Sequence, residues 1–488
     1  MNDSIRWFTK KKMVVGLGLF LSACAMGPEF TSPAAPDVKG YTITPMTAAL
    51  SVSGDKQAQR LQMGHTVSSQ WWELFHSSAL TALVNLAIEN NQNLAAAKAT
   101  LAEARKSVLQ AEGALYPQID VNTSYERQRI GTTVAASNLY VVGANASYVP
   151  DIFGGSRREI EFQQALADNQ FYQLGAAYLT LTGNIVTQSI NLASLNAEIA
   201  AVDEIIVDDE KNLRLAEEKF EAGKSTQTDV MTAKSQLAND RTEIAPLRQQ
   251  VSIAKHAIAI LSGQFSGRWS PPVFDLGSLS LPRDLPVSLP SDLVRQRPDI
   301  LAAEAQLHAA SATIGIATAQ MYPSITLSGS LGTQALNSSG LFSASSQMWN
   351  LAAGLTAPIF HGGALEMQKE AAIDAFRASF ATYRQTILVA FGQVADTLRA
   401  LKHDAELLDA QKQSLETAGI ALNLQRLSYA AGKTDLFGLI DAERSYQQAK
   451  LGYVRAEGQR YQDTAQLFIV LGGGWWKSQN KVISISRP

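Results

Sequence analysis

Side chains that could do chemistry are sparse in this chain of 488 residues. Its six histidines show no spacing that suits a metal ion, and no nucleophile, phosphate-loop or dinucleotide-binding motif is present. The acidic residues are scattered along expected helix faces, where solvated side chains are usual. The sequence therefore predicts a protein that is not an enzyme and holds no metal or cofactor. The histidines are His65, His76, His256, His308, His361 and His403.

The cysteine Cys24 stands in a pattern that predicts covalent modification. A basic stretch precedes the apolar residues Met13–Phe20, and Leu21-Ser22-Ala23 then places small residues before the thiol. This length and these flanks are typical of a secretory signal rather than a transmembrane helix. The pattern resembles a lipobox, which predicts removal of residues 1–23 and a covalent lipid on Cys24. Met26 stands where an Asp would favour the inner membrane, so the outer membrane is favoured. The alternative is a plain signal peptide with an incidental cysteine.

The overall composition argues against a nucleic-acid partner and against a membrane-spanning helix beyond the N-terminus. The net charge is −3, so no basic surface for nucleic acid is expected. Beyond the N-terminus no run of about 18 apolar residues could cross a bilayer as a helix. If the protein crosses a membrane, it must do so as a closed β-barrel, because unpaired strand edges are not tolerated in lipid.

The elements that must position any site come from a duplicated unit, whose copies lie roughly 206 to 209 residues apart. A repeat of this length is too long for one turn of a solenoid. It indicates two similar halves of a wall that other chains complete, and therefore a ring. The recurring anchors are Asn93–Ala97 and Asp299–Ala303, Leu115–Ile119 and Met321–Ile325, Ile152–Gly155 and Ile359–Gly363, and Phe220–Lys224 and Tyr429–Lys433.

Each copy contains a long heptad series. At 1.5 Å per residue, about 65 residues predict a helical rod of roughly 100 Å, and a strict heptad requires left-handed supercoiling. Gln188 and Asp209 interrupt the apolar companion positions of the first series. Each rod turns back at a Gly-Lys pair into a shorter return helix, and Pro246 should kink the first of these or break one of its hydrogen bonds. The series are Phe171, Tyr178, Ile185, Leu192, Ile199, Ile206, Leu213 and Phe220, and Phe380, Ile387, Val394, Leu401, Leu408, Leu415, Leu422 and Tyr429.

Shorter elements complete each copy. A helix is expected from Ala79 to about Leu115, ended by Tyr116-Pro117. Four segments of about ten residues suit tilted barrel strands, although their small polar residues suit a soluble hairpin equally. These segments are Gln118–Arg129, Asn138–Val149, Ser324–Thr333 and Met348–Ala357. The expected divisions are a signal peptide (1–23), an extended segment (24–75), a first repeat (76–262), a Pro-rich linker (263–290), a second repeat (291–471) and a tail (472–488).

This order of elements resembles the outer membrane factor family of tripartite efflux systems, in its lipoprotein branch related to TolC, OprM and NodT. The resemblance covers roughly residues 15 to 472, and the joint order of its motifs is specific. The motifs are Cys24–Phe30, Trp71–Phe75, Arg297–Ile300 with Glu304, the two Tyr-Pro breaks, the two Gly-Gly returns and the two Gly-Lys turns.

The resemblance implies a mainly helical fold with a small transmembrane β-barrel. Three copies would form a 12-stranded barrel in the outer membrane, continued by an α-barrel into the periplasm. The Gly-Lys turns would meet a periplasmic membrane-fusion (adaptor) protein, which joins the duct to an inner-membrane transporter of the RND or a similar class. The docking residues implied are Gly223, Lys224, Ser225, Gly432, Lys433 and Thr434.

The resemblance also implies a gate at the periplasmic end. Asp229 and Tyr429 fall where an acidic residue and a tyrosine help to hold that end closed, and Asp441 where an acid faces the lumen. The chain departs from the family at Gly438 and Thr434, where a second acid and an arginine are common. Tyr429 also ends a heptad series, so a plain core role is the alternative.

Two other functions remain open at this stage. The same fold serves as the outlet of type I protein secretion, although the lipobox favours efflux. A coiled-coil lipoprotein that tethers envelope layers would explain the heptads and Cys24 but not the paired strand segments. The cargo, such as drugs or other toxic compounds, is not specified by the sequence.

Overall fold

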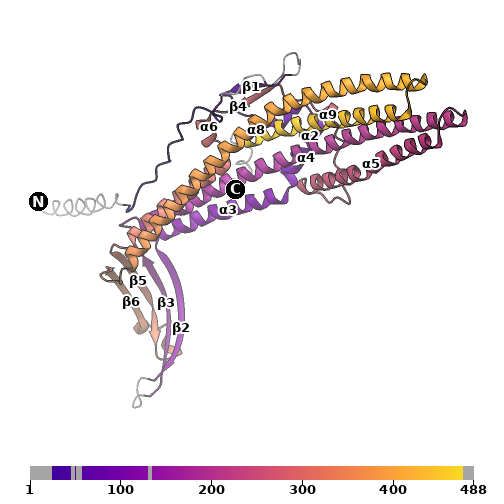
Figure 1. The fold of residues 1–488 in the computed structure, drawn as a ribbon. Helices are drawn as coiled ribbons and strands as arrows, with labels where there is room; N and C mark the ends of the chain where they lie inside the picture. The colour runs from indigo at the N-terminus through magenta and orange to yellow at the C-terminus, as the bar shows by residue number, and fades with distance from the viewer. Residues whose placement is uncertain (1–24, 45–49, 51–57, 130–134, 476–488) are drawn as a thin grey trace, which may run out of the picture. The chain divides into compact units, whose positions relative to one another are not determined.

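The structure, a computed structural model, describes residues 25–44, 50, 58–129 and 135–475. This part of the chain forms two compact units. The first comprises residues up to Pro33, Thr100–Phe171 and Ala302–Gln385, and the second Ala34–Ala99, Tyr172–Leu301 and residues from Thr386 onward. Four helices supply residues to both units: α3 (Gln92–Glu112), α4 (Gly155–Glu221), α7 (Pro298–Ala319) and α8 (Ala364–Ala430) (Figure 1).

The first unit contains a four-stranded antiparallel sheet in the order β2-β3-β5-β6 (Figure 1). Each copy supplies one hairpin, and β3 and β5 join the copies at the centre. There Gly143 lies opposite Gly332, and a Cβ on Gly332 would lie 2.5 Å from the carbonyl oxygen of Val142, so this close approach requires glycine. The four expected strands are confirmed as β2 (Gln118–Gln128), β3 (Ser137–Tyr148), β5 (Ser324–Ala335) and β6 (Gln347–Thr356).

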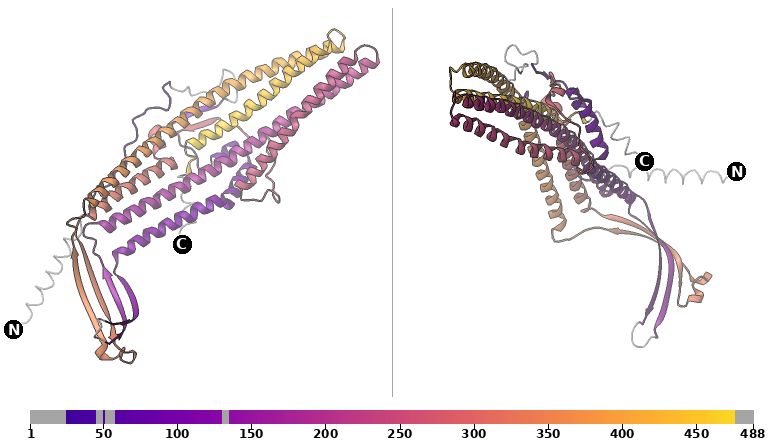
Figure 2. Two further views of the ribbon diagram at one scale, coloured as in Figure 1. Left: turned by 60° about the horizontal axis from the view of Figure 1, so that its bottom comes forward. Right: turned by 90° about the vertical axis from the view of Figure 1, so that its right-hand side faces the viewer.

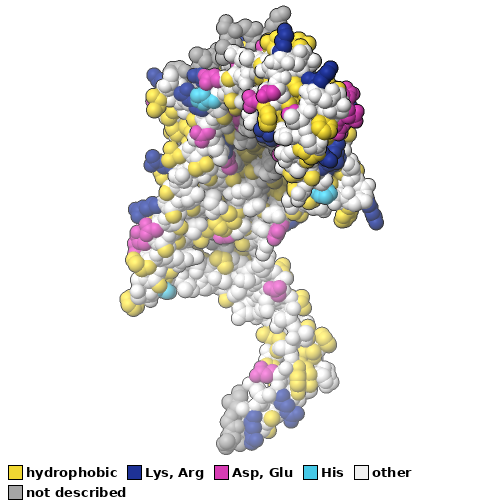
Figure 3. All heavy atoms as spheres, turned by 45° about the vertical axis from the view of Figure 1, so that its right-hand side comes forward, with side chains coloured by type: hydrophobic (Ala, Val, Ile, Leu, Met, Phe, Trp, Pro, Cys, Tyr) yellow, Lys and Arg dark blue, Asp and Glu magenta, His cyan; other side chains and the backbone are white. Residues whose placement is uncertain are grey.

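The two faces of the sheet differ in polarity. Because side chains alternate across a strand, the register places one set of apolar residues together: Ile119, Val121, Tyr125, Tyr140, Val142, Ala144, Ala146, Ile325, Leu327, Leu331, Trp349, Leu351 and Leu355. The opposite face is mostly polar and includes Asp120, Asn122, Ser124, Asn145, Ser147, Thr326, Ser328, Ser330 and Asn350. The apolar face is left uncovered, since Trp349 and Leu351 are 73% and 79% exposed. Figure 3 shows hydrophobic side chains gathered over part of the sheet.

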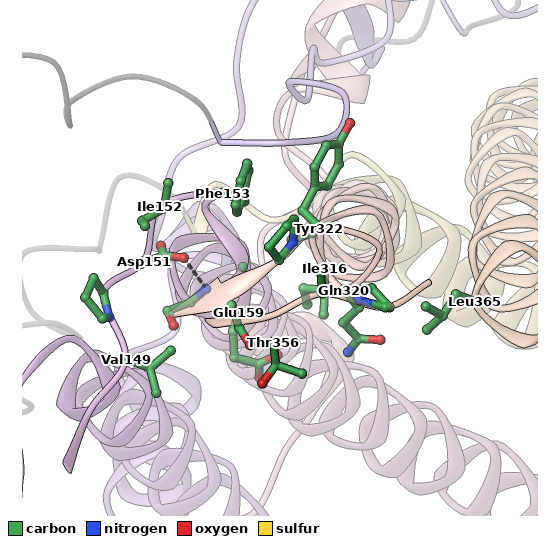
Figure 4. Close-up of a pocket in the computed structure, with 18 of the residues that line it drawn as sticks. Val149, Asp151, Ile152, Phe153, Glu159, Ile316, Gln320, Tyr322, Thr356 and Leu365 are labelled. Atoms are coloured by element: carbon green, nitrogen blue, oxygen red, sulfur yellow. Dashed lines mark hydrogen bonds between the residues drawn. The ribbon is translucent and has the colours of Figure 1, made fainter. Parts of the chain in front are cut away.

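In the first unit, a cavity of about 560 Å³ lies where the strands join the helices (Figure 4). The ring of Phe153, from a Gly-Gly return of the first copy, stacks on Tyr322, from a Tyr-Pro break of the second, with centroids 4.9 Å apart. Asp151 accepts a hydrogen bond from the Ser156 backbone N–H at 3.1 Å, which satisfies one of the free donors at the start of α4. Motifs that are far apart in sequence therefore meet at this junction.

Two antiparallel helical hairpins dominate the second unit (Figure 2). The first hairpin is α4 from Tyr172 with α5 (Gln227–Leu261), and the second is α8 from Thr386 with α9 (Leu436–Val470). Both rods, α4 and α8, have 67 residues, and both return helices have 35. The rods and return helices expected from the heptads are confirmed. Pro246 lies inside α5, which continues through it as one helix.

Each return helix ends against the start of its own copy's N-terminal helix. The expected single helix over 79–115 is wrong in one respect, because it divides at Asn91 into α2 (Ser78–Asn90) and α3. Asn91 is extended (φ −67°, ψ 124°), accepts from the Leu94 N–H at 2.9 Å, and donates to the Leu261 carbonyl at 2.9 Å. In the second copy the Arg297 guanidinium donates to the Val470 carbonyl at 3.0 Å.

Two segments expected to be irregular pair with each other in the second unit. Strand β1 (Arg60–Met63) lies parallel to β4 (Asp284–Val287), so the extended segment and the Pro-rich linker are more ordered than expected. Gln59 orders the approach, because its side chain donates to the Pro282 carbonyl at 2.9 Å and accepts from Arg460 at 3.1 Å. Short helices flank these strands in the sequence: η1 (Trp71–Phe75) follows β1, η3 (Leu276–Ser278) precedes β4, and α6 (Pro290–Val294) follows β4.

One helix in the described part of the chain, α7, is long and apolar enough to cross a bilayer. Of its most apolar stretch, 56% is buried inside the structure, as in the core helix of a folded domain.

Candidate functional site

The turns of the two hairpins have the same backbone. Gly223 and Gly432 adopt φ of +67° and +71°, the left-handed region that glycine tolerates best. The N–H of Lys224 donates to the Lys219 carbonyl at 2.7 Å, and the N–H of Lys433 donates to the Ser428 carbonyl at 2.9 Å. This pattern closes the carbonyl end of a helix. Both expected docking turns are therefore exposed, well-formed helix stops.

The return helices begin with different caps. In the first hairpin Thr226 and Asp229 form a capping box: the hydroxyl of Thr226 accepts from the Asp229 N–H at 3.2 Å, and the Asp229 carboxylate accepts from the Thr226 N–H at 2.7 Å. In the second, Asp435 accepts from the Gly438 N–H at 3.0 Å. The Asp229 carboxylate is thus already engaged within its own hairpin.

Tyr429 lies in the core between the hairpins. It is 4% exposed and packs in a cluster with Ala216 and Val230 of the first hairpin and Leu436 of the second. Its hydroxyl makes no hydrogen bond to any described residue, so it does not reach Asp229. Burial, and then the charge of Asp229, raise the pKa of the Tyr429 hydroxyl above its ordinary value. The structure brings the two expected gate residues near each other without bonding them.

A lysine that the sequence did not single out makes the contact instead. The Lys219 ammonium of α4 donates to the Tyr429 carbonyl at 2.6 Å and lies 3.4 Å from the centroid of the Tyr429 ring. It therefore caps the C-terminal end of α8, where a cation is favoured by the helix dipole, and makes a cation–π contact. Burial and Lys224 lower the pKa of Lys219.

The remaining expected residues lie near the turns. Asp441 is exposed on α9. The Ser225 hydroxyl donates to the Ala216 carbonyl at 3.3 Å. The Thr434 hydroxyl is buried and makes no hydrogen bond within the described residues. Among those same residues, no three His, Cys, Asp or Glu side chains are placed to hold a metal ion.

Polar contacts join the two hairpins along their length. Arg426 of α8 pairs with Asp208 of α4 at 2.7 Å, and Arg455 of α9 pairs with Glu198 of α4 at 2.9 Å. Although burial opposes it, hydrogen bonds from Arg426 and Lys211 hold the pKa of Asp208 below its usual value. Further links run from Lys450 to Glu204, Asn212 to Glu443, Arg444 to Gln236, and Gln447 to Asp240.

Sequence reasoning missed Lys219 and these links because their partners belong to the other copy. No periodicity within one copy reports which polar side chain faces another helix. One signal was available, since Asp209 interrupts an apolar series and proves to be only 4% exposed.

Cys24, the expected lipidation site, lies outside the described residues, but the chain that follows it is held in the first unit. The Met26 N–H donates to the Phe153 carbonyl at 3.0 Å, and Arg158 donates to the Met26 carbonyl at 3.0 Å. Gly154 (φ +81°) accommodates this contact, because a Cβ there would lie 2.4 Å from the Cα of Ala25.

Known proteins resemble this chain along nearly its whole length. It is 30% identical over 452 residues to the pyoverdine export outer membrane protein OpmQ of Pseudomonas aeruginosa, covering 89% of this chain and 94% of that protein. It is 28% identical over 462 residues to the cation efflux system protein CusC of Escherichia coli, covering 94% and 98%. The solved structure of the outer-membrane channel OprN matches with a TM-score of 0.83 at 26% identity, covering 93% of this chain and all of that one.

The family match falls on both copies. Residues 83–264 and 289–473 match the family described as outer membrane efflux protein. Its members found here are channel and efflux proteins of the outer membrane rather than enzymes. Fold, location and family expected from the sequence are thus confirmed, and the chain belongs to the outer membrane efflux protein family.

Proposed function

We propose that three copies of this chain form the outer-membrane exit duct of a tripartite pump, gated at the helical turns. The observation that carries the proposal is the two-faced sheet. Its apolar face is uncovered, its other face is polar, and its edges β2 and β6 pair with no described strand. Such a sheet suits a barrel wall with lipid outside and water inside, closed edge to edge by further copies.

The number of copies follows from the four strands that each one supplies. An eight-stranded barrel has an interior that side chains fill, whereas larger barrels leave a channel. Three copies are the smallest number that exceeds eight strands. A cyclic trimer is therefore the simplest assembly that opens a passage, and it also completes the ring implied by the duplication.

The turns supply the partner surface and the gate. The turns Gly223-Lys224-Ser225 and Gly432-Lys433-Thr434, whose glycines and lysines are exposed, would meet the adaptor, which connects the duct to an inner-membrane transporter. We assign the closed state to packing of the two hairpins, with Lys219 and Tyr429 as the contact nearest the turns. Asp229 supports that end through its capping box, and the exposed Asp441 is the residue we place toward the lumen.

A lipid on Cys24 would anchor the N-terminal segment in the outer membrane. Support comes from Met26, whose backbone is fixed beside the strand–helix junction of the first unit, the unit that carries the barrel strands. No other cofactor is proposed.

The cargo we propose is a small molecule rather than a protein. OpmQ is named for pyoverdine export and CusC for cation efflux, and both are about equally similar to this chain. Because ducts of similar sequence serve such different solutes, we infer that the inner-membrane transporter, and not the duct, selects the cargo.

The test is single-channel conductance of the purified full-length protein in a planar bilayer, after its trimer mass has been measured. Small, infrequent openings that become frequent in Lys219→Met support a gated duct. A monomer, or a folded trimer that stays silent in the wild type and in Lys219→Met, contradicts it. In cells, Lys224→Glu with Lys433→Glu should weaken adaptor cross-linking while the trimer persists, and unchanged cross-linking and efflux would contradict the docking assignment.

A further inference from the structure

Each hairpin carries an aspartate in its apolar seam. The companion positions of α4 recur every seven residues, as at Val202, and Asp209 takes the next one. Asp209 lies 14 residues before Gly223, which is two heptads. In α8, Asp404 takes the matching heptad position and lies 28 residues before Gly432, which is four heptads. Apolar side chains pack best in a seam, so a carboxyl group in the same register of both rods calls for another explanation.

A second aspartate faces each of these from the return helix. Asp240 of α5 lies beside Asp209, and Asp463 of α9 lies beside Asp404, each within hydrogen-bonding distance. Asp240 lies 17 residues after Gly223, and Asp463 lies 31 residues after Gly432, so both pairs have the same offset about their turns. A carboxylate oxygen can only accept, so a bond between two such groups needs a proton on one of them.

The contacts of the first pair indicate which member carries the proton. Oδ2 of Asp240 already acts as an acceptor, because it accepts from Gln236 Nε2 at 2.8 Å and from Gln447 Nε2 at 3.0 Å. Asp209 is 4% exposed, and its Oδ2 has no hydrogen-bond partner among the described donors. A proton on Asp209, donated to Asp240, satisfies both residues.

The charges around Asp209 favour the same assignment. Asp208 of α4 and Glu443 of α9 add negative charge, and burial raises the pKa of Glu443 as well. Arg426 of α8 pairs with these two carboxylates, at 2.7 Å and 3.6 Å. Burial, followed by Asp240, Glu443 and Asp208, raises the pKa of Asp209 to about 9. The space beside it is about 10 Å³, room for one water at most, so a proton fits there better than a metal ion.

The second pair repeats this arrangement. Oδ2 of Asp404 has no hydrogen-bond partner in the described part of the chain. Oδ2 of Asp463 accepts from Gln459 Nε2 at 2.9 Å. Burial and Asp463 raise the pKa of Asp404 to about 8, with the cationic Arg460 of α9 opposing them.

We propose that Asp209–Asp240 and Asp404–Asp463 are proton-bridged latches, each of which holds the two helices of its hairpin together and releases them when the proton is lost. At neutral pH each pair shares one proton and carries one negative charge. In alkali each pair carries two charges that repel at close range without the dielectric screening of bulk water.

The direction of the pH effect on stability follows from the raised pKa values. The folded pair keeps a proton that the unfolded chain, with an ordinary Asp pKa of about 4, has already lost. The contribution of each pair to stability is therefore fully present below about pH 4 and is lost as pH rises to about 8 for Asp404 and about 9 for Asp209. Above those values the native hairpins themselves lose the latch. Loss of the latches should make the duct open more easily, an inference that rests on the function proposed above.

The proton is tested by infrared titration of the purified full-length protein. We expect the absorption of a protonated carboxylic acid at pH 7, its loss by about pH 10, a decrease of about half in Asp209→Asn or Asp404→Asn, and its absence in the double variant. Asp203→Asn and Asp396→Asn, which remove exposed charges from the same two helices, should leave it unchanged. No such band in the wild type, or a band that persists in the double variant, overturns the proposal.

The latch is tested by spin labels on exposed positions of α4 and α5, introduced as Arg214→Cys and Ser235→Cys. Their distance distribution should broaden between pH 7 and pH 10 in the wild-type background. It should stay narrow in Asp209→Asn, whose amide donates to Asp240 at every pH. The same broadening in Asp209→Asn overturns the latch.

Conductance separates the latch from the function of the duct. Opening frequency should rise with pH, by about tenfold per pH unit for each proton that opening releases, and should level off above about pH 9, where both latches have lost their protons. This rise should vanish in the Asp209→Asn, Asp404→Asn double variant. If the infrared and distance responses are present but conductance ignores pH, the latch stands and its link to gating is overturned.

Discussion

The first and second hairpins share a backbone and differ in what their side chains bury. Their rods have 67 residues each, their return helices 35, and their turn glycines nearly the same φ. Phe220 and Tyr429 occupy the same place in the repeat, yet Phe220 is 41% exposed and Tyr429 is 4% exposed. Duplication has preserved helix length and turn geometry, whereas contact between the copies decides which aromatic ring enters the core.

The contact between the ends of the two hairpins is one-sided. The C-terminal end of α8 receives a cation from the first hairpin, because Lys219 donates to the Tyr429 carbonyl. The residue at the place of Lys219 in the second copy is Ser428, which carries no cation to return the contact. The second hairpin is therefore the one whose end depends on the other, and we expect it to move first when the duct opens.

The largest effect should come from the base of the second hairpin. Arg297 is 8% exposed and holds the Val470 carbonyl, both oxygens of Asp299 at 2.9 and 2.6 Å, and Gln393 at 2.8 Å. Removing a buried partner of this kind costs about 3 kcal/mol, at the low end of the range because Asp299 is 42% exposed. The loss in the free energy of unfolding is measured by denaturant unfolding of Arg297→Ala and the wild type in detergent.

The matching change at the base of the first hairpin is Asn91→Ala. It removes a cap on the Leu94 N–H and one bond to the Leu261 carbonyl, which should cost about 1 kcal/mol. If Arg297→Ala and Asn91→Ala lower the free energy of unfolding equally, the bases of the two hairpins are equivalent and the expected difference between them is wrong.

The next effect concerns the contact between the turns. Lys219→Met keeps the apolar stem but removes the cation from the Tyr429 carbonyl and ring, which should cost about 1 kcal/mol and make openings several-fold more frequent. Lys224→Met, which removes an exposed charge five residues further on, is the matched control. A similar increase in both variants would assign the effect to net charge at the tip.

Heptads and turn residues predicted the elements of this fold because those signals are local. The rods, the return helices, the four strand segments and both Gly-Lys turns were predicted from spacing and residue type. For example, strands expected at 118–129 and 324–333 are observed at 118–128 and 324–335. The break at Asn91 was missed because asparagine is tolerated inside helices, and only its bond to Leu261 shows the reason for a cap there.

The candidate site was less predictable for a related reason. Lys219 looked like one more solvated lysine near a helix end, and the strand pairing of 60–63 with 284–287 joins segments more than 200 residues apart. Asp229 was expected to help Tyr429 hold the periplasmic end closed, but a hydrogen bond from Thr226, three residues away, already engages its carboxylate. Long-range partners cannot be read from periodicity.

A smaller effect should distinguish the two caps. Asp229→Ala removes one half of the capping box of α5, and Asp435→Ala removes the single cap of α9; each should cost about 1 kcal/mol. Amide hydrogen exchange should quicken in the first turn of α5 in one variant and of α9 in the other. If Asp229→Ala also loosens the end of α8, then Asp229 acts on Tyr429 through more than its own hairpin.

The smallest effect should come from the Tyr429 hydroxyl. Tyr429→Phe keeps both contacts of Lys219, one with the aromatic ring and one with the backbone carbonyl of residue 429. It removes only the hydroxyl, which has no hydrogen-bond partner among the described residues. Losing an unpaired buried polar group costs little and can stabilise the fold, so opening frequency should stay within about twofold of the wild type. Tyr429→Ala, which removes the ring from the core cluster, should raise it strongly. If Tyr429→Phe opens the channel as readily as Tyr429→Ala does, the hydroxyl must bond to another copy in the closed trimer. The gate would then lie between copies rather than between the two hairpins of one.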